Sequence, residues 1–382
     1  PALSHTERID VLSTGANRVN DPALRARLLA RIATELMFSS DWRRARTLAE
    51  RARTEAGRAN DPSVLPEVLM RHFHATCTPH NLEERRRYMR TVVEIADAAH
   101  DSVQLFFALS ASASAAIEAG LRDEADDYLD VAFSLGVDAD VPVLTYNVEC
   151  IRVWRTGLDG DLDEAERLAL SAIEIGKANG IANAAMGPSM QIGCIRWQQA
   201  RFEELLPLLQ MRPNTVDPSR SVLLSRALAN VDRAHGEAAA LLVRAAQQDF
   251  ADVPLGLNWA GLMVAAAEAS FLLGEARVAR VVLAHLASFR DRVAFNGTWG
   301  IAPRAFAAGV AAAGAPGVAG ATVDEYFEQA IVVCEQLRAP ALRARTAMTW
   351  SRVLSERGAF PGKVVSLMED ARESLDDRRI DR

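Results

Sequence analysis

The sequence predicts an all-α protein, a right-handed α-solenoid of about nine helical hairpins. Three observations lead to this prediction. Strong helix formers such as alanine, leucine, arginine and glutamate are abundant. Charged segments that resemble helix starts recur along the chain at an interval of 40 residues. A glycine or another small residue precedes most of these starts, where a helix would have to end.

The composition fits a folded repeat array. The chain has 382 residues, more than one ordinary globular core usually holds, so it contains either several domains or repeated units. Hydrophobic residues make up 49% and charged residues 24%, which excludes a disordered chain. The formal net charge of −7 argues against a protein that binds nucleic acid over its whole surface, so we expect no direct nucleic-acid contact.

Cysteine usage and hydropathy indicate the compartment. The four cysteines are scattered and form no CxxC pair, so neither a disulfide framework nor a structural zinc site is predicted. The sequence shows no signal peptide and no apolar run of about 18 residues that would cross a membrane. We therefore expect a reduced, cytoplasmic protein without a cofactor.

The repeat is the main signal. The charged starts with the fixed interval lie at Asp41, Asn81, Leu121, Asp161 and Arg201. The interval then drifts, and similar starts follow near Glu237, Glu275, Val323 and Gly362. Small residues before the starts would end the preceding helix in the left-handed conformation that glycine adopts most easily. They are Gly120, Gly160, Ala200, Gly236, Gly274 and Gly358.

Small residues also recur inside the predicted hairpins, where two helices that cross closely need them. On the second helices they form pairs seven apart: Ala45 and Ala52, Ala125 and Ala132, Ala165 and Ala172. The first helices carry Ala33, Ala113, Gly193, Ala229 and Ala267 at an equivalent position.

Proline marks boundaries. Asp21-Pro22 and Asp61-Pro62 are typical of an N-cap followed by proline at the first helical position. Pro188 and Pro207 fall inside predicted helices, so we expect a kink or a shortened helix there. The alanine- and glycine-rich segment 308–321 weakens the eighth hairpin.

Two parts of the chain are expected. Residues 1–20 form an N-terminal helix or leader that caps the array or belongs to a preceding module, and residues 21–382 form the repeat solenoid. The chain begins with Pro1 rather than Met, so we expect an excised or processed segment of a longer protein.

The segment from Gly160-Asp161-Leu162-Asp163-Glu164-Ala165 to Ala172 resembles the tetratricopeptide signature, and Gly120 to Ala132 resembles it nearly as well. The unit of 40 residues is longer than the standard 34. Further segments resemble the repeat regions of large bacterial ATP-binding regulators, including LuxR-type regulators related to the maltose-regulon activator and actinobacterial regulators linked to a cyclase or an NTPase. These segments are 71–85, 249–259 and 342–346. The resemblance implies a region that senses an inducer or a partner protein for a regulatory NTPase or DNA-binding module in the parent chain.

Candidate chemistry is sparse. His72, His74, Cys77 and His80 are the one metal-like cluster, but His72 and His74 would point to different faces of a helix, so we predict no metal site. The arginine runs 43–53 and 85–87 adjoin glutamates at helical spacing, which favours a solvated face with weak ion pairs over a phosphate site. No catalytic motif is recognisable, and the segment 358–364 is one residue short of a P-loop, so we predict a chain without enzymatic activity.

The concave surface is the predicted binding site, because solenoids offer extended concave faces. When each hairpin is aligned on its glycine and alanine marks, the inward positions are His74, Ser110, Ser114, Asn147, Trp154, Trp197, Gln198, Arg226, Asn230, Arg233 and Glu268. Arg226, Asn230 and Arg233 are spaced i, i+4 and i+7, so on one helix they share a face and the two arginines could clamp a carboxylate or a phosphate. The tryptophans offer flat contact surface, although packing between hairpins would also explain them.

The sequence therefore predicts a ligand- or partner-binding sensor region of a bacterial regulator, which recognises a protein segment or a small-molecule inducer on its concave face. The alternative is a stand-alone scaffold that docks protein segments. The two would use the same kinds of side chain, so the sequence leaves both open.

Overall fold

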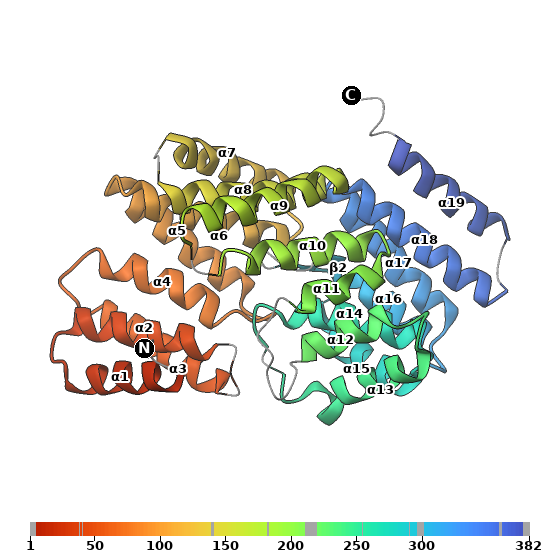
Figure 1. Cartoon of the computed structure of the whole chain (residues 1–382), viewed down its shortest axis with the longest axis horizontal. Helices are drawn as coiled ribbons and strands as arrows, with labels where there is room; N and C mark the ends of the chain where they lie inside the picture. The colour runs from red at the N-terminus through yellow and green to blue at the C-terminus, as the bar shows by residue number, and fades with distance from the viewer. Residues whose placement is uncertain are drawn as a thin grey trace. The chain divides into compact units, whose positions relative to one another are not determined.

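The computed structural model describes residues 5–37, 39, 41–138, 141–181, 183–210, 220–253, 255–289, 291–295, 302–358 and 361–376. Within these ranges the chain forms 19 α-helices, three short 3-10 helices and one two-stranded antiparallel sheet, in which Val293 pairs with Pro303 (Figure 1). The predicted all-α class is confirmed. Over the same ranges, no helix has the length and apolar character that a bilayer crossing requires.

The chain divides into two compact units. Unit 1 comprises Pro1–Ala116, Glu124–Asp140 and Asp252–Trp259, and unit 2 comprises Ile117–Asp123, Val141–Ala251 and Ala260–Arg382. Each unit is therefore built from segments that are not contiguous in the sequence.

Unit 1 holds the first helices of the chain. They are α1 (His5–Arg18), α2 (Pro22–Leu36), α3 (Trp42–Ala56), α4 (Val64–Ala75), α5 (Leu82–Ala98) and most of α6 (Ser102–Glu118) and α7 (Arg122–Asp138). Helix α1 packs on α2, and α2, α3 and α4 pack on one another. Their shared core is rich in alanine, including Ala26, Ala33, Ala45 and Ala52, none of which is exposed.

Unit 2 holds the remaining elements. In chain order they are α8 (Pro142–Leu158), α9 (Leu162–Ala178), α10 (Met186–Gln198), η1 (Phe202–Glu204), α11 (Leu205–Gln210), α12 (Arg220–Ala229), α13 (His235–Ala245), η2 (Gln247–Phe250), α14 (Trp259–Leu272), α15 (Ala276–Leu286), η3 (Ala287–Phe289), β1 (Val293–Ala294), β2 (Ala302–Pro303), α16 (Arg304–Ala313), α17 (Gly320–Gln336), α18 (Pro340–Glu356) and α19 (Pro361–Asp376). Consecutive helices form antiparallel-type neighbours, with α8 on α9, α12 on α13, α16 on α17 and α18 on α19. Helix α18 also contacts α8, α10 and α16, so it joins segments that are far apart in the sequence.

The predicted interval is present in the structure. Helical segments begin at Trp42, Leu82, Arg122, Leu162 and Phe202, each 40 residues after the one before. The later starts near Glu237, Glu275, Val323 and Gly362 correspond to α13, α15, α17 and α19. Each start therefore follows its charged marker in the sequence within a few residues.

Left-handed residues end the preceding helices at most of the predicted positions. The φ angles of Gly120, Gly160, Ala200, Gly274 and Gly358 are 78°, 90°, 57°, 68° and 64°. Gly236 was predicted to do the same, and that prediction is wrong, because this glycine is the second residue of α13. The chain makes that turn with residues 230–233 instead.

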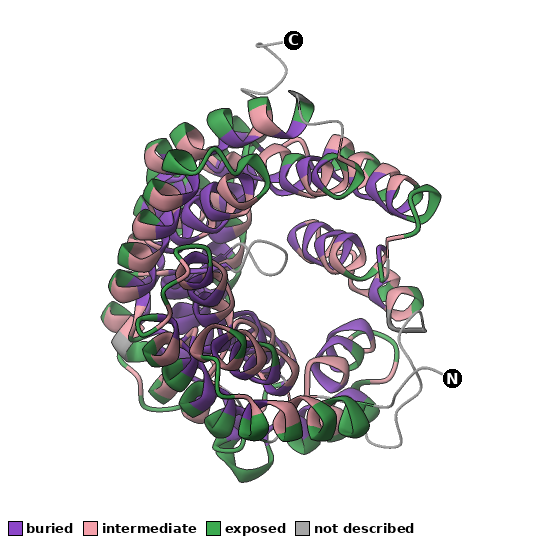
Figure 2. Ribbon diagram, turned by 90° about the vertical axis from the view of Figure 1, so that its left-hand side faces the viewer, coloured by how far each residue is buried: buried purple, intermediate pink, exposed green. Residues whose placement is uncertain are grey.

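The small residues lie at helix contacts, as predicted. Ala45, Ala52, Ala125, Ala132, Ala165 and Ala172 are all fully buried. Figure 2 shows that buried residues occupy the sides of the helices that face their neighbours, while exposed residues occupy the opposite sides. This alternation within each helix is the periodicity of an amphipathic α-helix.

Two of the proline predictions need correction. Asp21 caps α2 by accepting from the backbone N–H of Ala23 at 2.9 Å, with Pro22 at the first helical position. Asp61 instead accepts from Ser63, and α4 begins only at Val64, so Pro62 lies in the turn before the helix. Pro188 and Pro207 kink nothing, because each is the third residue of its helix, where no intrahelical bond needs its missing N–H. The helices are shortened, as the second half of that expectation held.

Candidate functional site

Three of the predicted concave-face residues meet inside unit 2. Trp197 and Gln198 end α10, and Glu268 lies in the middle of α14. The indole Nε1–H of Trp197 donates a hydrogen bond to Oε2 of Glu268. Residues 71 positions apart therefore form one polar contact, which the alignment of hairpins had placed on a common face.

A fourth residue completes the group. Arg345 of α18 forms an ion pair with Oε1 of Glu268 through its Nη2. Its guanidinium carbon Cζ lies 4.4 Å from the ring centroid of Trp197, and its Nη1 donates to the backbone oxygen of Gln198 at 3.3 Å. The cation is thus held by a carboxylate and by the face of an indole, whose negative π-cloud attracts it. We call Trp197, Gln198, Glu268 and Arg345 the Trp197 cluster.

The charges of the Trp197 cluster are buried. The Glu268 and Arg345 side chains are 8% and 10% exposed, whereas Trp197 is half-buried. The side-chain Oε1 of Gln198 and Nε of Arg345 are also buried and have no hydrogen-bond partner among the described residues. Because an unmatched buried polar atom costs free energy, one acceptor and one donor remain available here for a ligand's polar groups.

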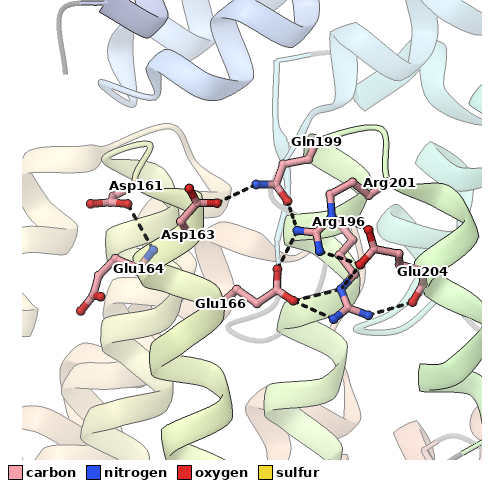
Figure 3. Close-up of polar contacts among 8 residues, drawn as sticks. All are labelled: Asp161, Asp163, Glu164, Glu166, Arg196, Gln199, Arg201 and Glu204. Carbon is pink, nitrogen blue, oxygen red and sulfur yellow. Dashed lines mark hydrogen bonds and ion pairs between the residues drawn. The ribbon is translucent and has the colours of Figure 1, made fainter. Parts of the chain in front are cut away.

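A second polar network fixes the orientation of α10 (Figure 3). Arg196 donates from Nη2 to Oε1 of Glu166 on α9 at 2.7 Å, and Nη1 of Arg201 donates to Oε2 of the same carboxylate at 2.8 Å. Arg201 also binds Glu204 of η1 at 2.6 Å, and this hydrogen bond raises the pKa of Arg201 and lowers that of Glu204. Since successive helical residues are rotated by about 100°, fixing Arg196 on α9 directs Trp197 and Gln198 to other faces of α10.

The other predicted residues of α8 and α6 do not join the cluster's printed contacts. Trp154 is buried and meets Phe295 edge-on, with ring centroids 5.1 Å apart. Asn147 is half-buried and donates to the backbone oxygen of Val143 at 2.7 Å. Ser110 is half-buried and donates to the backbone of Phe106 at 2.8 Å, and Ser114 is half-buried on the same helix.

The predicted arginine clamp is wrong. Helix α12 ends at Ala229, so Asn230 and Arg233 lie in the following turn and do not share a helix face with Arg226. The Asn230 side chain donates to the backbone oxygen of Arg226 at 2.8 Å, which satisfies the last turn of the helix. Arg233 is exposed and pairs with Glu203 at 3.5 Å. The periodicity argument failed because nothing in the sequence marked the early end of the helix.

His74 lies in unit 1 at a small surface pocket. The pocket is also lined by Met37, Trp42, Arg46 and the segment 255–257. The ring of His74 meets that of Phe73 edge-on at 5.1 Å. Burial lowers the pKa of His74 to about 4, and the charge of Arg85 lowers it further, so the imidazole is neutral at pH 7.

The metal-like cluster of the sequence does not assemble. His72 is buried and its Nε2 lies 3.0 Å from Oε1 of Glu50, while its Nδ1 lies 3.3 Å from Oγ1 of Thr76. Across the residues that the structure covers, no group of three or more histidine, cysteine or acidic side chains is arranged to hold a metal ion. His72 therefore serves as a buried link between α3 and α4.

Arg345 is the functional candidate that the sequence did not single out. It lies in the segment 342–346 that carried part of the family resemblance, but nothing local marks its side chain as buried. Its partner Glu268 is 77 residues away, and such a pairing is visible only in the folded chain.

A comparison with models of known protein families found no match for this chain, and a search of curated proteins found none either. The functional argument therefore depends on the geometry of the chain itself.

Proposed function

We propose that this chain is a right-handed α-solenoid of about nine tetratricopeptide-like hairpins, and that it serves as a sensor region of a cytoplasmic bacterial regulator. Its recognition centre is the Trp197 cluster. The proposal is supported by the 40-residue spacing of the helix starts and by the convergence of Trp197, Gln198 and Glu268, three residues expected on one inner face.

The buried pair of Glu268 and Arg345 is the observation that carries this proposal. Removing two charges from water costs several kcal/mol per ion, and well-packed apolar residues of similar volume often stabilise a fold as well or better. A helical array does not need such a pair for stability. A charge pair beside a half-buried tryptophan is well suited to bind a polar ligand with a flat face.

Exchange of partners would connect binding to conformation. A ligand carboxylate or phosphate would compete with Glu268 for the guanidinium of Arg345, which offers a fork of parallel donors. Release of Glu268 would loosen the contact between α14 and α18. A ligand shifts the array only if it binds the two arrangements with unequal affinity. Small-angle scattering with and without a saturating ligand measures whether curvature changes.

Thermal unfolding against a library of metabolites, nucleotides and sugars tests the proposal. A ligand present at a hundred times its dissociation constant should add about 2.7 kcal/mol of stability. Glu268→Gln and Arg345→Lys should reduce the ligand-induced shift, because each removes one element of the charge pair while keeping the size of the side chain. The matched control is Arg352→Gln, an exposed arginine two turns further along α18.

A ligand whose effect survives both cluster variants would contradict the assigned centre. If no compound in the library shifts the unfolding midpoint, the partner is a protein segment, and pull-downs from the source cell become the next experiment. That outcome would favour the scaffold function over the small-molecule sensor.

A further inference from the structure

We propose that unit 1 carries a separate binding site for a short aliphatic carboxylate, in the pocket where Arg46 and His74 meet. Unit 1 alone forms the pocket, since its lining residues come from α2, α3, α4 and the segment 252–259. The site is independent of the Trp197 cluster, which lies wholly in unit 2.

Arg46 supplies the positive charge. It is exposed, and it forms no ion pair or hydrogen bond within the described part of the chain. The carboxylates of its own helix are engaged elsewhere, because Glu50 binds His72 and Arg53, while Glu55 binds Arg25 and Arg58. An arginine at the rim of a pocket with no internal partner is available to a ligand anion.

His74 supplies a neutral hydrogen-bonding group. Its ring contacts Phe73, but its nitrogens make no hydrogen bond among the described residues. A neutral imidazole presents one N–H donor and one acceptor. One carboxylate can therefore accept from the Arg46 guanidinium and from the His74 N–H together, which a lone surface arginine does not offer.

The remaining walls select the rest of the ligand. Trp42 is 9% exposed, and Met37, Leu255 and Leu257 are half-buried around the same space. These apolar side chains disfavour a second charge and favour a short hydrocarbon group. The pocket is small and partly open, so it fits a carboxylate with a few carbons and not a nucleotide or a sugar.

Sodium butyrate is the probe that tests this assignment. The Hε1–Cε1 resonance of His74, identified by its loss in His74→Gln, should shift along a saturable curve as butyrate is added to the full chain. A ligand with so few atoms is expected to bind in the millimolar range, so the titration extends to about 50 mM. Sodium chloride at the same concentrations controls for ionic strength.

The variants locate the charge. Arg46→Gln should weaken butyrate binding about tenfold or more, the loss expected when a charged hydrogen bond is removed. Arg51→Gln is the matched control, because Arg51 is equally exposed on the same helix and lies outside the pocket lining. Butanol, which lacks the anion, should produce no comparable saturation.

Either of two results would overturn the proposal. A His74 resonance that responds to butyrate no more than to sodium chloride would show that the pocket holds no carboxylate. Equal weakening by Arg46→Gln and Arg51→Gln would show a diffuse charge effect and not a site. Glu268→Gln should leave the butyrate titration unchanged, so failure here is distinguishable from failure of the Trp197 cluster.

Discussion

Arg304 and Glu118 form an ion pair in the interior of unit 2, with Nη2 2.9 Å from Oε1 and side chains 2% and 6% exposed. The two residues are 186 positions apart, and they join the end of α6 to the first residue of α16. The guanidinium also lies 5.9 Å from the ring centroid of Phe289. The pair therefore ties together segments that the sequence order separates by almost half of the chain.

Removing one member of this pair should destabilise the protein strongly. Arg304→Met leaves the Glu118 carboxylate buried without its cation, and such a loss typically costs about 3–5 kcal/mol. The double variant Glu118→Gln, Arg304→Met removes both charges and should be more stable than the single one. Urea-induced unfolding of the three proteins measures the difference.

An exposed pair on α18 provides the control. Arg352 and Glu356 lie 2.9 Å apart with both side chains about half exposed, so Arg352→Met should cost less than about 1 kcal/mol. If Arg304→Met were as mild as this surface change, the buried pair would have no special part in the stability of unit 2.

Gly176 of α9 lies where no side chain fits. A Cβ atom there would lie 2.4 Å from the Cβ of Ala184 and 3.0 Å from the ring of Tyr146. Alanine normally stabilises a helix relative to glycine by about 1 kcal/mol, but overpacking costs about 1–3 kcal/mol. Gly176→Ala should therefore lower the free energy of unfolding, measured by thermal or urea denaturation.

Gly157 is the matched position on α8. Its added Cβ would meet Ala165 at 3.8 Å, an ordinary contact, so Gly157→Ala should gain part of the helix propensity and stabilise the protein. Equal effects of the two variants would mean that the close approach of Gly176 to Ala184 relaxes freely.

The positions of the helices were predictable because their signals are local. Gly160 has a positive φ, Asp161 follows it and accepts a hydrogen bond from the backbone of Glu164, and α9 begins between them. Gly236 has the same sequence context but lies inside a helix, because the preceding turn was completed three residues earlier. One glycine does not determine a boundary unless the residues around it agree.

The candidate site was predictable only in part. Trp197 and Glu268 were found from their places in the repeat, since equivalent positions of stacked hairpins face the same way. Arg345 was missed because its burial depends on Glu268 and Trp197, contacts that no local pattern encodes. Arg233 was wrongly included, because the spacing assumed a helix that ends at Ala229.

Two cysteines should resist alkylation in the folded protein. Burial raises the pKa of the Cys150 thiol to about 11 and that of Cys334 to about 12. Since the thiolate is the nucleophile, both should react with iodoacetamide at pH 8 far more slowly in the native state than in urea. Mass spectrometry of peptides after timed labelling measures the two rates, and native rates equal to those in urea would contradict the burial of these residues.

Unit 1 should lose stability as the pH falls from about 6.5 toward 4. An unfolded histidine titrates near pH 6.5, whereas burial lowers the pKa of His74 to about 4 and also lowers the pKa of His72. Between these values the unfolded chain binds more protons than the folded one, so the free energy of unfolding decreases as protons are added. Glu50 opposes the shift of His72 but not that of His74, whose charged neighbour is Arg85.

The contribution of His74 can be isolated with a pair of variants. His74→Gln removes the group that would take up about one proton on unfolding, so its stability should depend less steeply on pH between about 4 and 6.5 than that of the native chain. His235→Gln is the control, because the His235 side chain is exposed at the start of α13 and solvated in both states. Urea unfolding at half-unit pH steps gives the slopes, and a slope left unchanged by His74→Gln would show that its imidazole is as accessible to protons in the folded protein as in the unfolded one.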